Sequence, residues 1–117
     1  MKRDMDLIRA ILLEMEQAPS RDIKIHARGY SPEQIAYHLK LLKQAGLIEA
    51  IDQTNFDGLA FIPTSLTWQG HEFLEATRNE GVWQKLKAEL KDRGLSIPFK
   101  LVEELATKIT AEYLGLR

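Results

Sequence analysis

Apolar residues near the start of the chain recur at helical spacing. Between residues 3 and 17 they lie three or four positions apart, which places them on one face of an α-helix. They are Met5, Ile8, Ile11, Leu12 and Met15. Pro19 and Ser20 follow, so the pattern predicts a helix that ends near Gln17. Residues 23–26, Ile-Lys-Ile-His, alternate apolar and polar side chains and predict a short strand before Gly29.

The clearest helix start in the chain is at Ser31. Ser31 can cap a helix, Pro32 suits the first helical position, and Gln34 can complete a capping box. Gly46 is a natural stop, so we expect a helix that runs to Ala45. Its expected buried stripe is Ile35, Leu39 and Leu42.

A β-hairpin is predicted directly after this helix. Residues 47–51 read as a strand, residues 54–58 are rich in turn formers and end in Asp-Gly, and residues 59–63 read as the returning strand. Three further helices are expected, over residues 67–79 with Thr67 as cap and Trp68 as an apolar contact, over residues 82–91, and over about residues 96–114. The last has an apolar stripe made of Phe99, Val102, Ala106, Ile109 and Tyr113.

This order of elements resembles a winged-helix domain. Residues 31–48, Ser-Pro-Glu-Gln-Ile-Ala-Tyr-His-Leu-Lys-Leu-Leu-Lys-Gln-Ala-Gly-Leu-Ile, resemble the recognition helix and first wing strand of arsenic-repressor-type proteins. Residues 66–70, Leu-Thr-Trp-Gln-Gly, resemble the start of the post-wing helix in multiple-antibiotic-resistance-repressor-type proteins. The resemblance implies a mainly α (α+β) fold. It consists of a winged-helix-like domain over residues 1–80 with a two-stranded β-hairpin wing, and a C-terminal helical extension over residues 81–117.

A second resemblance covers nearly the whole chain. Residues 1–9, Met-Lys-Arg-Asp-Met-Asp-Leu-Ile-Arg, and residues 30–42, which fit Tyr-Ser-x-Glu-x-Ile-x-x-His-Leu-x-Leu-Leu, resemble domain-of-unknown-function family 2513. That family occurs in bacteria and phages and implies a prophage association but no established activity.

Composition narrows the function classes. The 117 residues include no cysteine, which excludes disulfides, thiolate metal sites and cysteine catalysis. No apolar run approaches the roughly 18 residues of a membrane span. The N-terminus has no signal-peptide pattern, so we expect a cytoplasmic protein without a membrane partner. Sixteen Lys and Arg against seventeen Asp and Glu give a net charge of −1, which does not by itself indicate nucleic acid.

Charge is distributed unevenly along the chain. Residues 21–43 hold five basic and two acidic side chains, a net charge of +3, whereas residues 44–65 hold three acidic side chains and no basic one. The predicted helix and its lead-in are therefore basic, but the predicted wing is acidic. A wing that lies along DNA phosphates normally offers Lys or Arg.

The basic segment suggests binding of double-stranded DNA by the helix that begins after Ser31. The candidate contacts to bases or phosphates are Arg21, Lys24, Arg28, Ser31, Gln34, Tyr37 and Lys40. Only about eleven residues separate Pro19 from Ser31, so the positioning helix that usually crosses the DNA backbone has little room. The alternative interpretation is a protein–protein interaction module in which Gln34, Tyr37 and Lys40 are ordinary solvated surface.

Catalysis, cofactors and metals are not expected. The glycines form no phosphate-binding loop, and the three histidines lack metal-ligand spacing. Helix capping accounts for Ser31, and we expect His38 to be a half-buried packing residue. The apolar stripe of the last helix could pack on the rest of the chain or pair two copies into a homodimer.

Overall fold

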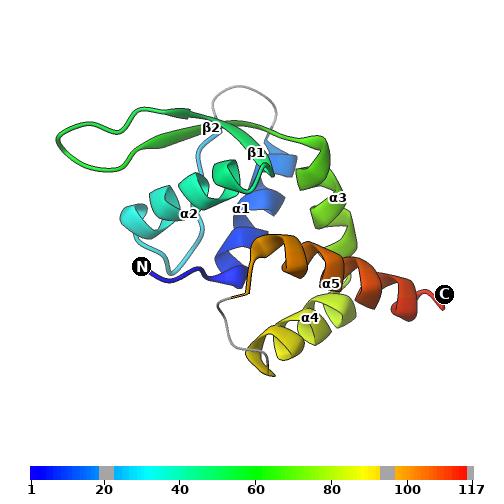
Figure 1. The fold of residues 1–117 in the computed structure, drawn as a ribbon. Coiled ribbons are helices and arrows are strands. Elements are labelled where there is room, and N and C mark those ends of the chain that lie inside the picture. The colour runs from blue at the N-terminus through cyan, green and yellow to red at the C-terminus, as the bar shows by residue number, and fades with distance from the viewer. Residues whose placement is uncertain (19–22, 93–96, 116–117) are drawn as a thin grey trace. The chain divides into compact units, whose positions relative to one another are not determined.

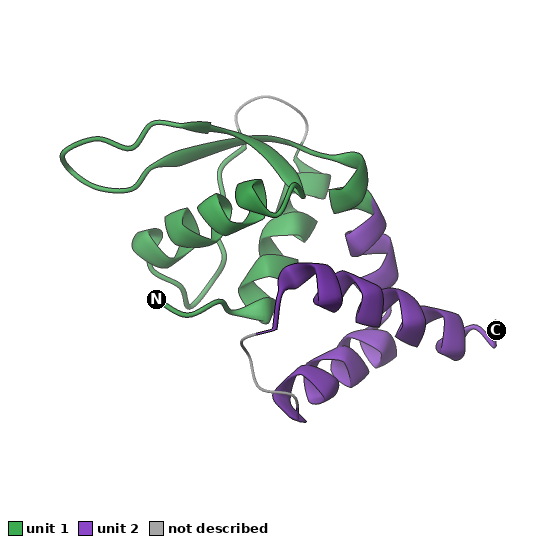
Figure 2. Cartoon of the chain, viewed as in Figure 1, with its two compact units in different colours: residues 1–71 green, residues 72–117 purple. Residues whose placement is uncertain are grey.

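A computed structural model describes residues 1–18, 23–92 and 97–115. The chain forms a mainly helical α+β fold with one antiparallel hairpin, which confirms the predicted fold class (Figure 1). It divides into two compact units, residues 1–71 and residues 72–117, with the boundary inside α3 (Figure 2). The elements are α1 (Met5–Gln17), α2 (Pro32–Gln44), β1 (Ile48–Asp52), β2 (Phe61–Leu66), α3 (Trp68–Thr77), α4 (Glu80–Asp92) and α5 (Phe99–Tyr113).

Helix α1 supplies much of the apolar core of unit 1. The five apolar residues predicted for its inner face are all buried, and so is Leu7. Asp4 caps the helix through Oδ1, which accepts a hydrogen bond from the Leu7 N–H at 3.1 Å. The helix packs against α2 and β2. Burial of this face is the main source of its stability, because 13 isolated residues would be a marginal helix in water.

The expected strand at residues 23–26 does not form. Residues 23–27 have no regular secondary structure, although Ile23 and Ala27 are buried as strand-like alternation would require. The His26 N–H donates instead to Glu14 Oε1 on α1, at 2.8 Å. A side chain of α1 thus satisfies one backbone group of the segment that was expected to be a strand. Within residues 23–31 there is also no helix of the positioning type.

The predicted hairpin is present, with its second strand shifted along the chain. Strand β2 begins at Phe61 and continues past Pro63 to Leu66. The register changes between Glu49 and Ala50, so that Ala50 faces Pro63 and Glu49 faces Ser65. This bulge accommodates the proline, which has no N–H for the ladder. The Thr64 hydroxyl donates to the Glu49 carbonyl oxygen at 3.1 Å across the bulge.

The base of the hairpin is closed by the first turn of α3. The Thr67 N–H donates to the Leu47 carbonyl oxygen at 3.0 Å, and Thr67 Oγ1 accepts from the Gly70 N–H at 3.0 Å. A Cβ at Gly70 would collide with the same Leu47 carbonyl oxygen. These contacts give a physical reason for the Leu-Thr-x-x-Gly sequence. Trp68, expected as an apolar contact, is 76% exposed.

Unit 2 is a small helical cluster. The Thr110 hydroxyl on α5 donates to the Ala76 carbonyl oxygen at 3.0 Å, and the Phe73 and Phe99 rings lie 5.2 Å apart. Its buried side chains on α4 and α5 are Val82, Trp83, Leu86, Leu90, Val102, Ala106 and Ile109. Tyr113, expected on the buried stripe of α5, is exposed and lies against Gly81. The expected boundary at residue 80 and pairing of copies through these helices stay predictions.

Candidate nucleic-acid interface

The predicted capping box fixes the N-terminal end of α2. Ser31 Oγ accepts from the Gln34 N–H at 3.1 Å, and Gln34 Oε1 accepts from the Ser31 N–H at 2.9 Å. Pro32 occupies the first helical position as expected. Both side-chain oxygens are used inside the helix, so Ser31 and Gln34 act mainly on the position of α2. Their remaining hydrogen-bonding capacity, the Ser31 O–H and the Gln34 amide N–H groups above all, could still reach a ligand.

His38 anchors α2 from its buried side. The residue is 1% exposed, rather than half-buried as predicted. Its Nε2 lies 2.8 Å from the backbone nitrogen of Asp4, and its Nδ1 lies 2.8 Å from the Gln34 carbonyl oxygen. The Asp4 N–H can only donate, so Nε2 accepts and the ring proton lies on Nδ1, where it donates to Gln34. One neutral tautomer therefore satisfies both groups.

The same network reaches the loop before α2. The Tyr30 hydroxyl hydrogen-bonds to the carboxylate of Asp4, which also caps α1. Burial raises the pKa of the Tyr30 hydroxyl, and the charge and hydrogen bond of Asp4, with the charge of Asp6, raise it further. Tyr30 is thus held in its protonated, donating form.

Sequence reasoning missed this network, and one signal could have found it. Asp4 lies in the segment of residues 1–9, and Tyr30 and His38 lie in the segment of residues 30–42. These are the two segments that carry the family resemblance. Of the three residues only His38 is buried, and a buried polar side chain needs a partner.

The outer face of α2 carries the side chains that could contact a ligand. Glu33, Tyr37, Lys40 and Gln44 recur three or four positions apart, opposite the buried Leu39 and Leu42. Glu33 and Gln44 are exposed, and Tyr37 and Lys40 are half-exposed. The Tyr37 ring meets the His38 ring edge-on, with centroids 5.6 Å apart. Tyr37 is therefore held by a neighbour while part of its surface stays accessible.

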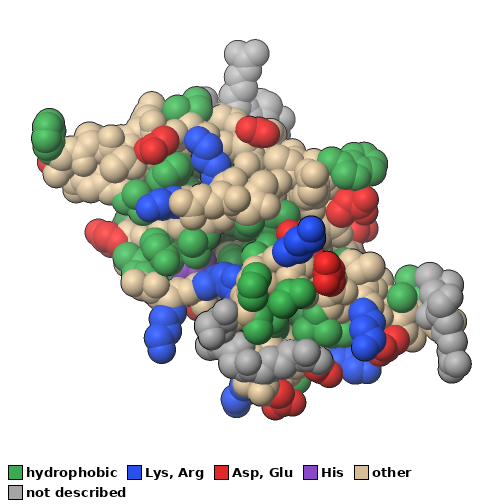
Figure 3. Space-filling model, viewed as in Figure 1, with side chains coloured by type: hydrophobic (Ala, Val, Ile, Leu, Met, Phe, Trp, Pro, Cys, Tyr) green, Lys and Arg blue, Asp and Glu red, His purple; other side chains and the backbone are tan. Residues whose placement is uncertain are grey.

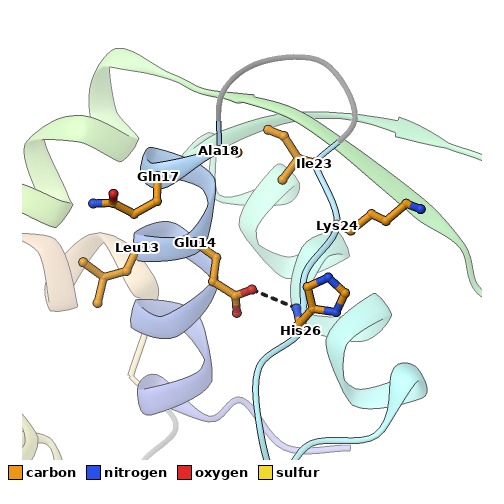
Figure 4. A pocket seen from close by; sticks show the side chains of 7 residues that line it. All are labelled: Leu13, Glu14, Gln17, Ala18, Ile23, Lys24 and His26. Atoms are coloured by element: carbon orange, nitrogen blue, oxygen red, sulfur yellow. Dashed lines mark hydrogen bonds between the residues drawn. The ribbon is translucent and has the colours of Figure 1, made fainter.

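Residues 23–31, the described part of the lead-in to α2, supply two further exposed cations. Lys24 and Arg28 are both exposed, whereas Arg21 lies outside the described residues. Lys24 borders a pocket of about 550 Å³ between α1 and the lead-in (Figure 4). Figure 4 shows its side chain extending away from α1, whereas Glu14 turns toward the His26 backbone. The pocket is lined by Leu13, Glu14, Gln17, Ala18, Ile23, Lys24 and His26.

The neighbouring hairpin is acidic, and its Asp52 carboxylate interacts electrostatically with two lysines of α2. Hydrogen bonds from Thr54 hold the pKa of Asp52 below its usual range, and the charges of Lys43 and Lys40 add to this. Lys43 Nζ lies 5.9 Å from the centre of the Phe61 ring on β2. Figure 3 shows basic and acidic side chains interspersed over this face of unit 1. The candidate surface is therefore mixed in charge and not a continuous basic strip.

Two further observations concern metals and membranes. Among the described residues, no three His, Cys, Asp or Glu side chains are grouped so that they could hold a metal ion. In the same part of the chain, no helix has both the length and the apolar character needed to cross a membrane.

Comparison with known proteins gives one family and one relative. The family model described as hypothetical protein DUF2513 matches residues 2–96. An uncharacterized protein of Haemophilus influenzae is 41% identical over 118 residues, which cover 98% of this chain and 100% of the relative. No solved structure matches the chain.

Proposed function

The chain belongs to the DUF2513 family of hypothetical proteins, and we propose that it is a small cytoplasmic regulator that binds double-stranded DNA. One observation carries the proposal. Helix α2 is fixed from its buried side by His38 and by the capping box, while its opposite face remains accessible. The order α1, α2, hairpin, α3 supports a winged-helix-like reading of unit 1.

In the proposed complex, α2 lies in the major groove. Its 13 residues span about 20 Å, and a B-DNA major groove about 12 Å wide admits an α-helix. Tyr37 and Lys40 reach base edges or phosphates, and Lys24 and Arg28 contact phosphates. Arg21 belongs to the same proposed set. Ser31 and Gln34 act chiefly by holding the end of the helix.

The acidic hairpin limits the rest of the interface. Glu49, Asp52 and Asp57 would be repelled by phosphates, so the hairpin lies off the DNA backbone in this proposal. Affinity then depends on few cations, so the binding is expected to be weak and its dependence on salt modest, since each phosphate contact adds about one unit to the salt slope. A regulatory role and a prophage association are part of the proposal, as is the absence of catalysis.

A titration at low salt tests DNA binding. The probe is a fluorescent pool of random-sequence duplexes of about 30 base pairs, long enough for one module to bind at several positions. We expect Lys40→Glu to weaken binding at least about tenfold and Tyr37→Ala to weaken it less, because one is a charge reversal and the other a lost contact.

The matched control is Lys85→Glu on α4, an exposed lysine whose reversal changes the net charge equally. Circular dichroism verifies that each variant is folded. No binding by the wild type at low salt would refute the proposal. Equal losses of DNA affinity for Lys40→Glu and Lys85→Glu would show that binding depends on net charge alone and not on the outer face of α2.

Protein binding is the second candidate function. The observation that favours it is the hairpin, which combines acidic residues with exposed Ile51, Phe56 and Ile62. Pull-downs from a host lysate with and without nuclease separate the two candidates. A partner set that disappears after nuclease treatment counts against this second candidate and in favour of nucleic acid.

A further inference from the structure

The tip of the hairpin presents a phenylalanine to solvent. Phe56 is fully exposed, and Figure 3 shows a hydrophobic side chain projecting from the tip. The turn beneath it is ordered by two backbone hydrogen bonds between Asn55 and Gly58, at 3.1 and 3.0 Å. Asn55 Oδ1 also accepts from the Asp57 N–H at 2.7 Å. The backbone at Phe56 is therefore already ordered by a formed turn, so binding in that position has to order mainly the side chain.

Residues 51–62 of the hairpin, here called the arm, carry side chains that determine what the hairpin could contact. Ile51, Leu59 and Ile62 are exposed apolar residues between the tip and the base. All charges of residues 44–65 are acidic, at Glu49, Asp52 and Asp57. A complementary surface must therefore be apolar and have lysine or arginine at its edge.

Unit 1 itself contains such a surface. An open groove of about 360 Å³ runs between the lead-in, α2 and β2. Its lining is apolar apart from the backbone and Lys24, and Lys43 lies over the Phe61 ring beside it. Its lining includes Lys24, Pro32, Ile35, Ala36, Phe61 and Ile62.

We propose that the hairpin tip of one copy of the chain docks into this groove on a second copy, with Phe56 as the anchor. The arm and the groove are neighbours in unit 1, so a two-fold pairing lets each copy both give and receive a tip. In this arrangement Asp57 approaches Lys24 of the second copy, which matches the opposite charges of arm and groove edge.

The expected dimer is weak. One buried phenylalanine contributes roughly 150–250 Å² of contact area, and a stable interface needs about 1,200–2,000 Å² in total. Two reciprocal tips fall short of that, so Ile51 and Leu59 must add area along the arm. A buried aromatic anchor in a pocket is nevertheless the typical centre of a binding hot spot.

This inference does not depend on DNA binding. The groove uses the side of α2 that carries Pro32 and Ala36, whereas the proposed DNA face carries Tyr37 and Lys40. Lys24 borders both surfaces, so substitutions at Lys24 are not diagnostic. Failure of the DNA titration would leave the dimer standing, and loss of the dimer would leave DNA binding by single copies.

The absence of native cysteine allows a direct test by disulfide trapping. A Phe56→Cys chain is mixed with an Ala36→Cys chain in a glutathione redox buffer. We expect the mixed disulfide to form at least about tenfold faster than one between Phe56→Cys and Leu101→Cys, which places a cysteine at an exposed position of α5. Equal rates, or a predominance of Phe56→Cys homodimers, would overturn the inference.

Sedimentation velocity over a concentration series provides a second readout. Phe56→Ser should raise the dissociation constant of the dimer at least about tenfold, and the matched loss of an exposed apolar residue, Leu101→Ser, should leave it unchanged. Phe56 is fully exposed, so its replacement leaves the fold intact. A wild type that stays monomeric throughout contradicts the inference. So does a dimer that Leu101→Ser abolishes and Phe56→Ser spares, because it would assign pairing to the C-terminal helices.

Discussion

Helix α2 and the β1–β2 hairpin are neighbours in unit 1 but are held by different interactions. His38 on α2 bonds to Asp4, 34 positions earlier in the chain, and its ring is buried. The hairpin beyond Asp52 bonds to itself, through Gln53 with Ala60 and Asn55 with Gly58. The side chains of α2 thus serve the fold of unit 1, whereas the outer arm exposes apolar residues that do little for folding. The proposed docking of the arm on a second copy rests on this difference.

The strongest test of this contrast is His38→Ala. The substitution removes a buried ring and leaves the Asp4 N–H and the Gln34 carbonyl oxygen without that partner. We expect the free energy of unfolding to fall by about 3 kcal/mol, from the cavity and the lost hydrogen bonds. Urea denaturation measures it. The control is His26→Ala, because His26 is exposed and contributes its backbone N–H, which the variant keeps. Similar losses for both variants would show that the network does not hold α2.

Gly70→Ala tests the base of the hairpin, where the arm does meet the core. Its Cβ would collide with the Leu47 carbonyl oxygen, and backbone cannot move aside as a flexible side chain can. We expect a loss of about 2 kcal/mol, after the higher helix propensity of alanine offsets part of the strain. Gly81→Ala on α4 is the matched control, because its new Cβ would meet the ends of the Asn79 and Tyr113 side chains. A neutral Gly70→Ala would mean that the base of the hairpin is not tightly fixed.

Tyr30→Phe gives a smaller effect with a distinctive pH dependence. The folded-state pKa of Tyr30 lies above its ordinary value of 10.0, so the folded protein holds this proton more tightly than the unfolded chain. The stability that this tighter proton binding contributes is fully present below pH 10.0. It is lost as the pH rises through the folded-state pKa of Tyr30.

We therefore expect the wild type to lose stability more steeply than Tyr30→Phe as the pH rises above 10.0. Near pH 7 the variant should lose only about 0.5 kcal/mol, the low end for one hydrogen bond. Thermal denaturation at each pH measures both quantities. Exposed Tyr113→Phe is the control. If stability depends on pH in the same way in the wild type and Tyr30→Phe, the Tyr30 hydroxyl does not contribute to the network.

Local rules predicted the elements that depend on neighbouring residues. The Ser31 capping box, the buried face of α1 and the turn before Gly58 are encoded within a few positions each, and the structure confirms them. Long-range partners decided the rest. Residues 23–26 form no strand, and the His26 N–H donates to Glu14 on α1 instead. Strand β2 continues past Pro63, with a bulge opposite it between Glu49 and Ala50.

The candidate site was predictable in part for the same reason. Helical spacing located the outer face of α2, and Tyr37 and Lys40 lie there, partly exposed. The same reasoning assigned Ser31 and Gln34 to DNA although their capping role uses both oxygens. The partner of His38 could not be derived, because no local rule links positions 34 residues apart.

Phe56→Ser is expected to have the smallest effect on stability and is the sharpest test of the arm. Phe56 is fully exposed, so its removal should change the free energy of unfolding by less than about 0.5 kcal/mol. Leu42→Ala on α2 should cost about 2–5 kcal/mol by comparison, because Leu42 is fully buried. Urea denaturation at dilute protein measures both in the absence of self-association. A large loss for Phe56→Ser would show that the arm packs within its own unit. Unchanged stability with altered self-association would separate the role of the arm from that of α2.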